Sequence, residues 1–344
     1  MRLMQIIAAG YVGGAQGFFE RLVPALADAG VEQRLAIHSG MKCIDSLSAT
    51  DIPLSQHRFG GRMNGRFNFS TRRALRDVAA QFRPDVTLAW QSGAVGLAPR
   101  KPGVLVGRLG GYEKMKHYKH CQHLVVNAPG IRDYILSNGW SGDRVHLISN
   151  FVSVDLGRAE PRDAHSTPND APLLFAAGRF HSHKAFDILL ESLVRLPGAY
   201  LWIAGDGDDA AALKSHAAAL KVDDRVRWLG WRDDIGALLN ACDIFVSSAR
   251  NEPLGNAVLE AMSAAKPIVA APAFGPAGLI EDGQNGRLVP IDDSEALADT
   301  IGELIANPTL ASELAAQGLK TYERNHSKAQ IVEEYLTFFN RIAG

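Results

Sequence analysis

Cysteine is scarce in this sequence. Only three cysteines occur among 344 residues (Cys43, Cys121 and Cys242), and no two of them form a Cys-x-x-Cys pair. An odd number of scattered cysteines argues against a disulfide framework and against a zinc site. The sequence therefore predicts a protein of a reducing compartment, with no metal site.

Long apolar runs are missing as well. No uninterrupted apolar stretch reaches the roughly 20 residues that a membrane-spanning helix needs. The opening residues, MRLMQIIAAG, are short and run straight into a glycine turn, which predicts a first strand and not a signal peptide. These features predict a cytoplasmic protein, in which any contact with the membrane would be peripheral.

The chain has almost no net charge, but its two halves differ. Residues 1–165 hold 21 Lys and Arg against 13 Asp and Glu, and the excess is dense over 58–83 and 114–119. Such a field favours an anionic partner, either a phosphorylated acceptor or an acidic membrane face. A solvated basic face paired with the acidic second half remains equally open. Nucleic acid is disfavoured because the basic segments lack interleaved aromatic residues.

The length and the alternation of patterns predict two α/β domains. At 47% hydrophobic residues, 344 residues can fill two cores. Short apolar runs alternate with helical patterns, which argues for parallel sheets covered on both faces. The polar segment 160–172 predicts the linker, so we expect domains at 1–165 and 166–326, followed by a terminal helix over 327–344. The expected strands are Leu3–Ala8, Gln33–Ile37, Asp85–Ala89, Gly103–Val106, His123–Val126, Val145–Ile148, Leu173–Ala177, Tyr200–Ala204, Val226–Trp228, Ile244–Ser247 and 266–270.

The most informative stretch is 251–262, NEPLGNAVLEAM. Glu252 follows a strand pattern, and a helix is predicted to begin at Gly255 or Asn256. Glu260 then lies about one turn into the helix, on the side that faces back toward the loop. Backbone amides at the start of this helix suit a phosphate or a sugar hydroxyl.

Two cations follow the first strand of the second half. Arg179 and Lys184 lie five residues apart in a loop at the carboxyl end of that strand, where ligands of open α/β sheets bind. Arginine offers a fork of donors and lysine a point charge, so the two suit one diphosphate.

A glycine-rich turn follows the first strand of the chain. In GYVGGAQG, over 10–17, backbone amides of Gly13 and Gly14 could approach a phosphate. The strict G-x-G-x-x-G spacing is absent, and the second strand ends in IHSG without an acid to hold an adenosine ribose. An NAD-dependent oxidoreductase is therefore disfavoured.

These motifs together resemble the retaining family-4 glycosyltransferases (glycosyl transferases group 1). Over residues 173–290 the matches occur in the family's order, and in the first half only the Gly13-Gly14 loop matches strongly. The resemblance implies a GT-B fold, α/β with two Rossmann-like domains whose parallel sheets face a central cleft. It implies that the terminal helix over 327–344 packs back on the first domain. It also implies hexosyl-type transfer from a nucleotide-diphosphate sugar with retention, without metal or cofactor. A UDP-sugar is the expected donor, although the residues leave guanosine and adenosine open.

The resemblance also assigns roles to residues. It places Arg179, Lys184 and Glu252 at the reacting diphosphate and donor sugar, and Glu260 at the ribose. Arg232 is the candidate for stacking on the base. The remaining donor-binding positions are Gly13, Gly14, Gly205, Leu254, Gly255 and Asn256.

The acceptor side matches less well. Leu109 stands where family members often have a histidine, and Arg108, Glu113, Lys116 and His117 are the candidates for a charged acceptor, with a solvated loop as the alternative. The segment RLGGY and the segment EPLGN resemble members that build lipopolysaccharide cores and other envelope glycans. The expected partners are thus a nucleotide sugar and a glycan or glycolipid acceptor. A sugar-nucleotide epimerase and a non-catalytic GT-B binding protein remain alternatives.

Overall fold

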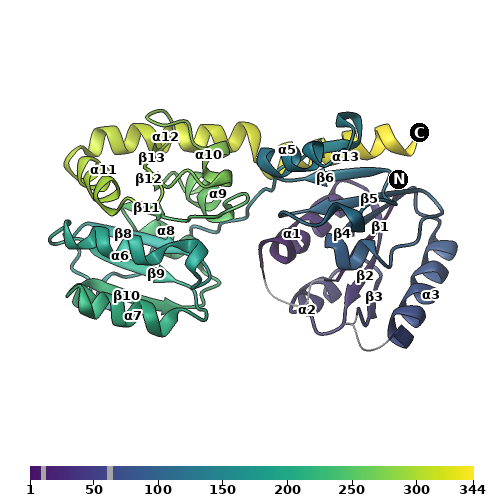
Figure 1. The fold of residues 1–344 in the computed structure, drawn as a ribbon, viewed down its shortest axis with the longest axis horizontal. Helices are drawn as coiled ribbons and strands as arrows, with labels where there is room; N and C mark the ends of the chain where they lie inside the picture. Colours follow the sequence, from purple (N-terminus) through teal and green to yellow (C-terminus); the bar gives the residue numbers. More distant parts are fainter. Residues whose placement is uncertain (9–12, 60–64) are drawn as a thin grey trace. The chain divides into compact units, whose positions relative to one another are not determined.

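The computed structural model describes residues 1–8, 13–59 and 65–344. The chain forms two compact units, which are drawn in Figure 1. Unit 1 comprises Met1–Phe151 together with Lys328–Gly344, and unit 2 comprises Val152–Ser327. Each unit is an α/β domain built on its own parallel sheet, as the sequence predicts.

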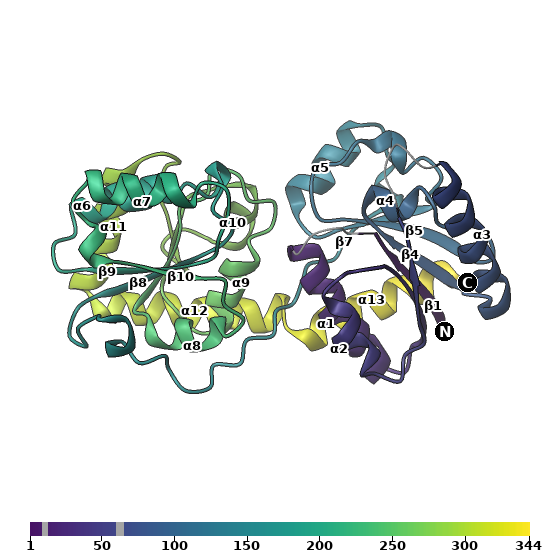
Figure 2. The same ribbon diagram turned by 90° about the horizontal axis from the view of Figure 1, so that it is seen from below.

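Unit 1 contains, within the described residues, a seven-stranded parallel sheet in the order β3-β2-β1-β4-β5-β6-β7. Its helices cover both faces, with α1, α2 and α13 on one side and α3, α4 and α5 on the other (Figure 2). The strands are β1 (Arg2–Ile7), β2 (Glu32–His38), β3 (Leu54–His57), β4 (Val86–Trp90), β5 (Val104–Leu109), β6 (His123–Val126) and β7 (Val145–Leu147). The helices are α1 (Gly14–Asp28), α2 (Cys43–Ser48), α3 (Gly65–Phe82), α4 (Gln91–Val95), α5 (Pro129–Ser137) and α13 (Lys328–Ala343).

Unit 2 contains a six-stranded parallel sheet in the order β10-β9-β8-β11-β12-β13. Helices α6 and α7 lie on one face and α8 and α12 on the other (Figure 2). The strands are β8 (Leu173–Ala177), β9 (Tyr200–Ala204), β10 (Val226–Gly230), β11 (Ile244–Ser247), β12 (Ile268–Ala270) and β13 (Arg287–Leu288). The helices are α6 (Phe186–Val194), α7 (Ala210–Ala219), α8 (Ile235–Ala241), α9 (Asn256–Ser263), α10 (Phe274–Leu279), α11 (Ser294–Ala306) and α12 (Pro308–Asn325).

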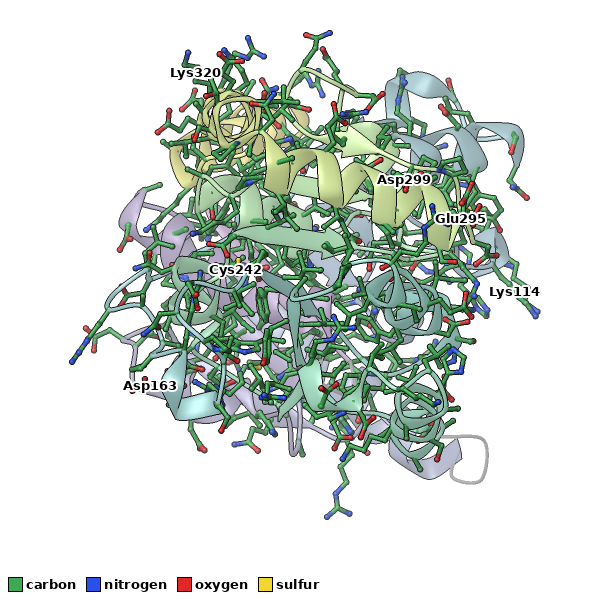
Figure 3. All side chains as sticks on the ribbon, turned by 90° about the vertical axis from the view of Figure 1, so that its left-hand side faces the viewer. Lys114, Asp163, Cys242, Glu295, Asp299 and Lys320 are labelled. Atoms are coloured by element: carbon green, nitrogen blue, oxygen red, sulfur yellow. The ribbon has the colours of Figure 1, made fainter. Side chains whose placement is uncertain are left out.

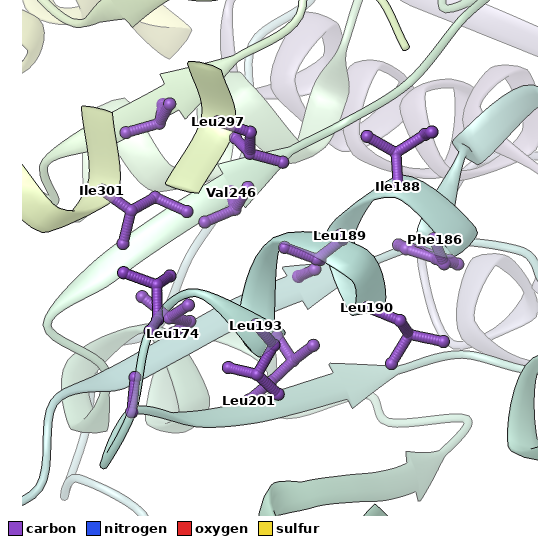
Figure 4. Packing of buried hydrophobic residues seen from close by; sticks show 14 of the residues in the cluster. Leu174, Phe186, Ile188, Leu189, Leu190, Leu193, Leu201, Val246, Leu297 and Ile301 are labelled. Atoms are coloured by element: carbon purple, nitrogen blue, oxygen red, sulfur yellow. The ribbon is translucent and has the colours of Figure 1, made fainter. Parts of the chain in front are cut away.

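The central strands are apolar on both faces because helices cover both. Every residue of β4 is buried, and its register pairs Trp90 with Ile7 of β1. In unit 2, Leu189 and Leu193 of α6 pack beside Leu297 and Ile301 of α11, over Val246 of β11 (Figure 4). This burial on both sides explains why the strand sequences are continuous apolar runs.

The terminal helix α13 completes the core of unit 1. Tyr335 and Phe339 are fully buried among residues of α1 and the sheet, with Phe18 6.4 Å from Tyr335 between ring centroids. The aromatic residues Tyr335, Phe338 and Phe339 of this helix thus form a packing face.

The segment 160–172 is bound to unit 2, so the interdomain linker predicted there lies within that unit. Contacts divide the chain between Phe151 and Val152. Arg162 donates hydrogen bonds to the carbonyl of Ala241 and forms an ion pair of 2.7 Å with Asp243. The indole of Trp202 donates to Thr167 at 2.9 Å. Polar composition predicted a linker here because sequence alone does not show these side-chain bonds.

Candidate donor-binding site

The candidate site lies at the carboxyl edge of the unit 2 sheet. Strands β8 and β11 are hydrogen-bonded neighbours, and the loops that follow them carry Lys184 and Glu252. Since parallel strands end at the same edge, the two loops meet there. The structure thus brings together two residues that the resemblance places at the donor.

Lys184 and Glu252 form an ion pair through Nζ and Oε2. Both side chains are about one-fifth exposed (24% and 19%), so a ligand can reach them. The loops are also joined through their backbones, because the amides of Arg250 and Asn251 both donate to the carbonyl of His183, at 2.9 and 3.2 Å. The ammonium and carboxylate groups are therefore held in place before any ligand arrives.

Arg250 holds the Lys184 loop in place through hydrogen bonds, a role that was not predicted from the sequence. Its guanidinium donates two hydrogen bonds to the Asp187 carboxylate, at 3.0 and 2.7 Å, and one to the Ser182 carbonyl at 2.9 Å. Burial would raise the pKa of Asp187, but the hydrogen bonds and charge of Arg250 outweigh it and lower that pKa. Arg250 stands two residues before Glu252 and Asp187 three after Lys184, and this proximity to the motifs was the available signal.

Glycines bring the loops after β8, β9 and β10 together. A Cβ on Gly205 would lie 1.9 Å from the Gly178 carbonyl oxygen, and one on Gly178 would lie 2.7 Å from Cε of Lys184. Gly205 donates its amide to the Gly230 carbonyl at 2.7 Å. The segment GDG over 205–207 therefore allows close backbone approach, as expected for a turn lining a ligand site.

Helix α9 begins at the same edge. Gly255 is its N-cap in the left-handed conformation (φ +87°), and Leu254 before it is buried. The amide of Gly275 donates to the Glu252 carbonyl at 2.7 Å, which fixes the approach to the helix. Glu260 lies in the second turn and is partly exposed, as is Asn256 in the first. The positive end of the helix dipole and its first amides thus lie beside Glu252.

Arg232 lies in the loop after β10 and is held by two carboxylates. Its guanidinium donates to both oxygens of Asp234, and Glu160 lies 3.2 Å away. Hydrogen bonding to Asp234 raises the pKa of Arg232 and lowers that of Asp234. These pairs orient Arg232, and its stacking on a base stays a prediction.

The glycine turn of unit 1 is partly described. Gly13 is the extended N-cap of α1, Gly14 is its first residue, and the Gly17 amide donates to the Gly13 carbonyl at 3.1 Å. Residues Gly10 to Val12 of the motif lie outside the described residues. The role of Gly13 and Gly14 against a phosphate stays a prediction.

Arg108 is a core residue, which corrects its prediction as an acceptor ligand. Its side chain is 1% exposed, and its guanidinium lies over the rings of Trp90 and Phe18, at 4.5 and 4.7 Å from their centroids. It donates to Tyr335 at 3.1 Å and to Asn150 at 2.5 Å. A group so enclosed cannot reach an acceptor without unpacking α13.

The other acceptor candidates differ among themselves. The Glu113 carboxylate accepts the Ser92 amide at 2.9 Å, at the start of α4, and so has a structural partner. Lys116 and His117 lie in an exposed 3-10 turn, Met115–His117. Lys114, just before that turn, extends from the surface (Figure 3). An acceptor role for Glu113, Lys116 and His117 stays a prediction.

The described residues offer neither a metal cluster nor a membrane-spanning helix. No group of three or more His, Cys, Asp or Glu side chains there could hold a metal ion. In the same part of the chain, every helix falls short of the length or apolar character needed to cross a bilayer.

Comparison with known proteins gives a consistent family. The family model for glycosyl transferases group 1 matches residues 157–321. The lipopolysaccharide core biosynthesis glycosyltransferase LpsE of Rhizobium meliloti (strain 1021) is 37% identical over 94% of this chain and 95% of its own. LpsD of the same organism is 34% identical over 99% of this chain and 98% of its own.

A solved structure shares the fold. The structure of Anabaena Alr3699/HepE in complex with UDP and glucose aligns with a TM-score of 0.84 at 20% identity, covering 99% of this chain and 100% of that one. The predicted family and fold class are both confirmed, and the NAD-dependent oxidoreductase is set aside. The chain therefore belongs to the glycosyl transferases group 1 and has the two parallel-sheet domains of the GT-B fold.

Proposed function

We propose that this glycosyltransferase moves a sugar from a nucleotide-diphosphate sugar to a glycan or glycolipid acceptor in lipopolysaccharide core or related envelope-glycan synthesis. The names of LpsE and LpsD support the pathway, since both relatives align over nearly the whole chain. The observation that carries the donor site is the Lys184–Glu252 pair beside the start of α9.

Unit 2 would bind the donor. Lys184 and Arg179, which is exposed in the same loop, supply positive charge to the diphosphate. The first amides of α9 add donors without side-chain entropy. Glu252 accepts hydrogen bonds from the donor sugar's hydroxyls, and Glu260 accepts them from the ribose. Because Glu252 already offsets the charge of Lys184, Arg179 and α9 must contribute to neutralising two phosphates.

The proposed reaction retains the anomeric configuration. The bond from the anomeric carbon to the diphosphate oxygen breaks, and the electron pair leaves with the phosphate. The acceptor hydroxyl oxygen forms its bond on the same face, and its proton passes to the departing phosphate oxygen. Lys184 and Arg179 stabilise the charge that develops there, which is the step where fixed cations act most strongly.

A UDP-sugar is the proposed donor, used without a metal ion. The HepE structure with UDP and glucose supports this base through the shared fold. Two side-chain cations and a helix start provide the positive charge that a metal supplies in other transferases. We place the protein at the cytoplasmic face of the membrane, peripherally, where a glycolipid acceptor is presented.

A transfer assay tests the proposal. Purified protein in EDTA is incubated with UDP-, GDP- and ADP-sugars and with truncated lipopolysaccharide cores, and the product anomer is assigned by NMR. We expect one UDP-sugar to give a product with the donor's anomeric configuration. Release of a free epimerised sugar without acceptor would favour the epimerase, and binding without turnover on any core would favour the non-catalytic alternative.

A further inference from the structure

Unit 1 contains a basic pocket that none of the donor-binding residues lines, although His117, a candidate for a charged acceptor, does. Its volume is about 560 Å³, within the range of small-molecule sites. Four permanent cations and two imidazoles line it, and no Asp or Glu is among the lining residues. The charged lining residues are Arg72, Arg76, Arg100, Lys101, His117 and His120.

Three segments build this pocket. Arg72 and Arg76 are one turn apart on α3, so they point to the same side of the helix. Arg100 and Lys101 precede β5, and His117 and His120 precede β6. Arg72 donates to the Gly96 carbonyl at 2.9 Å, which ties α3 to the segment after α4. This hydrogen bond fixes one wall of the pocket, and the side chains of Arg76, Arg100 and Lys101 line the cavity.

The pocket lies at the opposite edge of the sheet from the glycine turn. Arg100 and Lys101 stand before the amino end of β5, and the pocket floor includes Leu105 at the second position of that strand. Gly13 and Gly14 instead follow the carboxyl end of β1 and open α1, on the other face (Figure 2). A donor diphosphate at Gly13 and Gly14 could not also occupy this pocket.

The cations of the pocket are not neutralised by neighbours. Among the residues the structure describes, Arg72, Arg76, Arg100 and Lys101 form no ion pair with a carboxylate. Desolvation, with the charges of Arg100 and Lys119, lowers the pKa of His120. A bound anion would relieve this repulsion and raise that pKa.

We propose that this pocket binds a phosphate monoester, carried by a sugar or a lipid headgroup. Paired arginines suit phosphate because their forks match its oxygens, and lysine adds a point charge. Leu105, Val95 and Pro99 provide an apolar wall for the carrier. The site recognises a ligand independently of donor binding, so it goes beyond the proposed transfer.

Matched variants test the pocket. Arg76→Gln with Arg100→Gln removes two lining charges, and Lys42→Gln with Arg73→Gln removes two exposed charges of the same unit that do not line it. The probes are glucose 6-phosphate against glucose in calorimetry, and phosphatidylcholine vesicles with or without phosphatidic acid in sedimentation. We expect the wild-type protein to bind the phosphorylated probe. The affinity of the pocket variant should be about tenfold or more lower, and that of the control should change less than about twofold.

The outcomes distinguish a sugar phosphate from a lipid headgroup as the ligand, and the pocket from unit 2 as the binding site. Binding of glucose 6-phosphate identifies a sugar phosphate as sufficient, and binding only of phosphatidic acid vesicles identifies a lipid headgroup. Lys184→Gln should leave either binding intact; loss in that variant would assign the phosphate to unit 2 and overturn the pocket. Equal losses in the pocket and control variants, or no binding by wild type, would overturn it as well. None of these results depends on glycosyl transfer.

Discussion

At the residue scale, a charged side chain has opposite roles depending on what encloses it. Lys184 is partly exposed at a sheet edge beside Glu252, where a ligand can compete for it. Arg108 is enclosed by two aromatic rings and two hydrogen-bond partners. The first arrangement suits binding, and the second suits stability.

Lys184→Gln should lower transfer about 100-fold to 1,000-fold, because a fixed cation at a developing phosphate charge contributes on that order. The fold should persist, since the residue is at the surface of a loop held by Arg250. Lys214→Gln on exposed α7 is the control. Transfer by a folded Lys184→Gln protein at the wild-type rate would remove Lys184 from the reaction.

Arg108→Met should lower the free energy of unfolding by about 2–4 kcal/mol, because Tyr335 and Asn150 would lose a buried charged partner. Chemical denaturation measures this. If Arg108 bound the acceptor instead, the substitution would change the KM for the acceptor and leave stability unchanged, and that result would contradict a structural role.

At the element scale, the close packing of the unit 2 loops requires glycine, and the stability of α13 depends on the pair His123 and His146. Gly205 combines φ +142° with close approach to Gly178, so its replacement forces the backbone to move. Gly198 also has positive φ (+85°), but a Cβ added there would have no atom within 4 Å.

Gly205→Ala should therefore destabilise unit 2 by roughly 2–4 kcal/mol, from strain together with a clash. Gly198→Ala should cost only about 1 kcal/mol, from strain alone. Thermal unfolding of the two variants provides the comparison. If both variants lost a similar amount of stability, the close approach of Gly205 to Gly178 would not contribute to the stability of unit 2.

Helix α13 should weaken in acid through His146. Arg341 donates to His146 Nδ1 at 3.0 Å, so the neutral ring carries its proton on Nε2, facing His123 Nδ1 at 3.1 Å. Desolvation, with the charges of His123 and Arg341, lowers the pKa of His146 to about 4. The unfolded chain then binds more protons between about pH 6.5 and 4, so stability falls as pH falls through that window.

His146→Gln should reduce that loss, because glutamine can offer the same acceptor and donor without titrating. Denaturation curves from about pH 7 to 4.5 would show a shallower slope for the variant. Part of the slope should remain, since burial lowers the pKa of His326 to about 4 as well. An unchanged slope would contradict the assignment.

At the whole-molecule scale, the sequence predicted two parallel α/β domains and the family, and the structure and relatives confirm both. Glu252 and Lys184 were each predicted in a loop after a strand, but the sequence did not pair them, because only the fold shows that β8 and β11 are neighbours. Strand β3, with the sequence LSQH, and the two-residue β13 were not predicted, since short or polar edge strands carry no apolar run.

Other features could not be predicted from local sequence patterns, because they depend on contacts between distant parts of the chain. The burial of Arg108 depends on Tyr335, which lies 227 residues away, and no local pattern contains that contact. Arg162 likewise binds its segment to α8 and Asp243 across about 80 residues. The basic pocket also escaped prediction as a site, because its cations come from three segments that only the fold brings together.

The proposed donor site of unit 2 binds a nucleotide-diphosphate sugar with Lys184, Glu252, Glu260 and the start of α9. Calorimetry in EDTA, with UDP, GDP, ADP and their sugars alongside NAD, tests it most directly on wild type, Lys184→Gln and Glu260→Gln. We expect one nucleotide diphosphate to bind wild type without metal and each variant about tenfold or more weakly. Equal binding by all three proteins, or binding of NAD alone, would show that these residues do not form a nucleotide-sugar site.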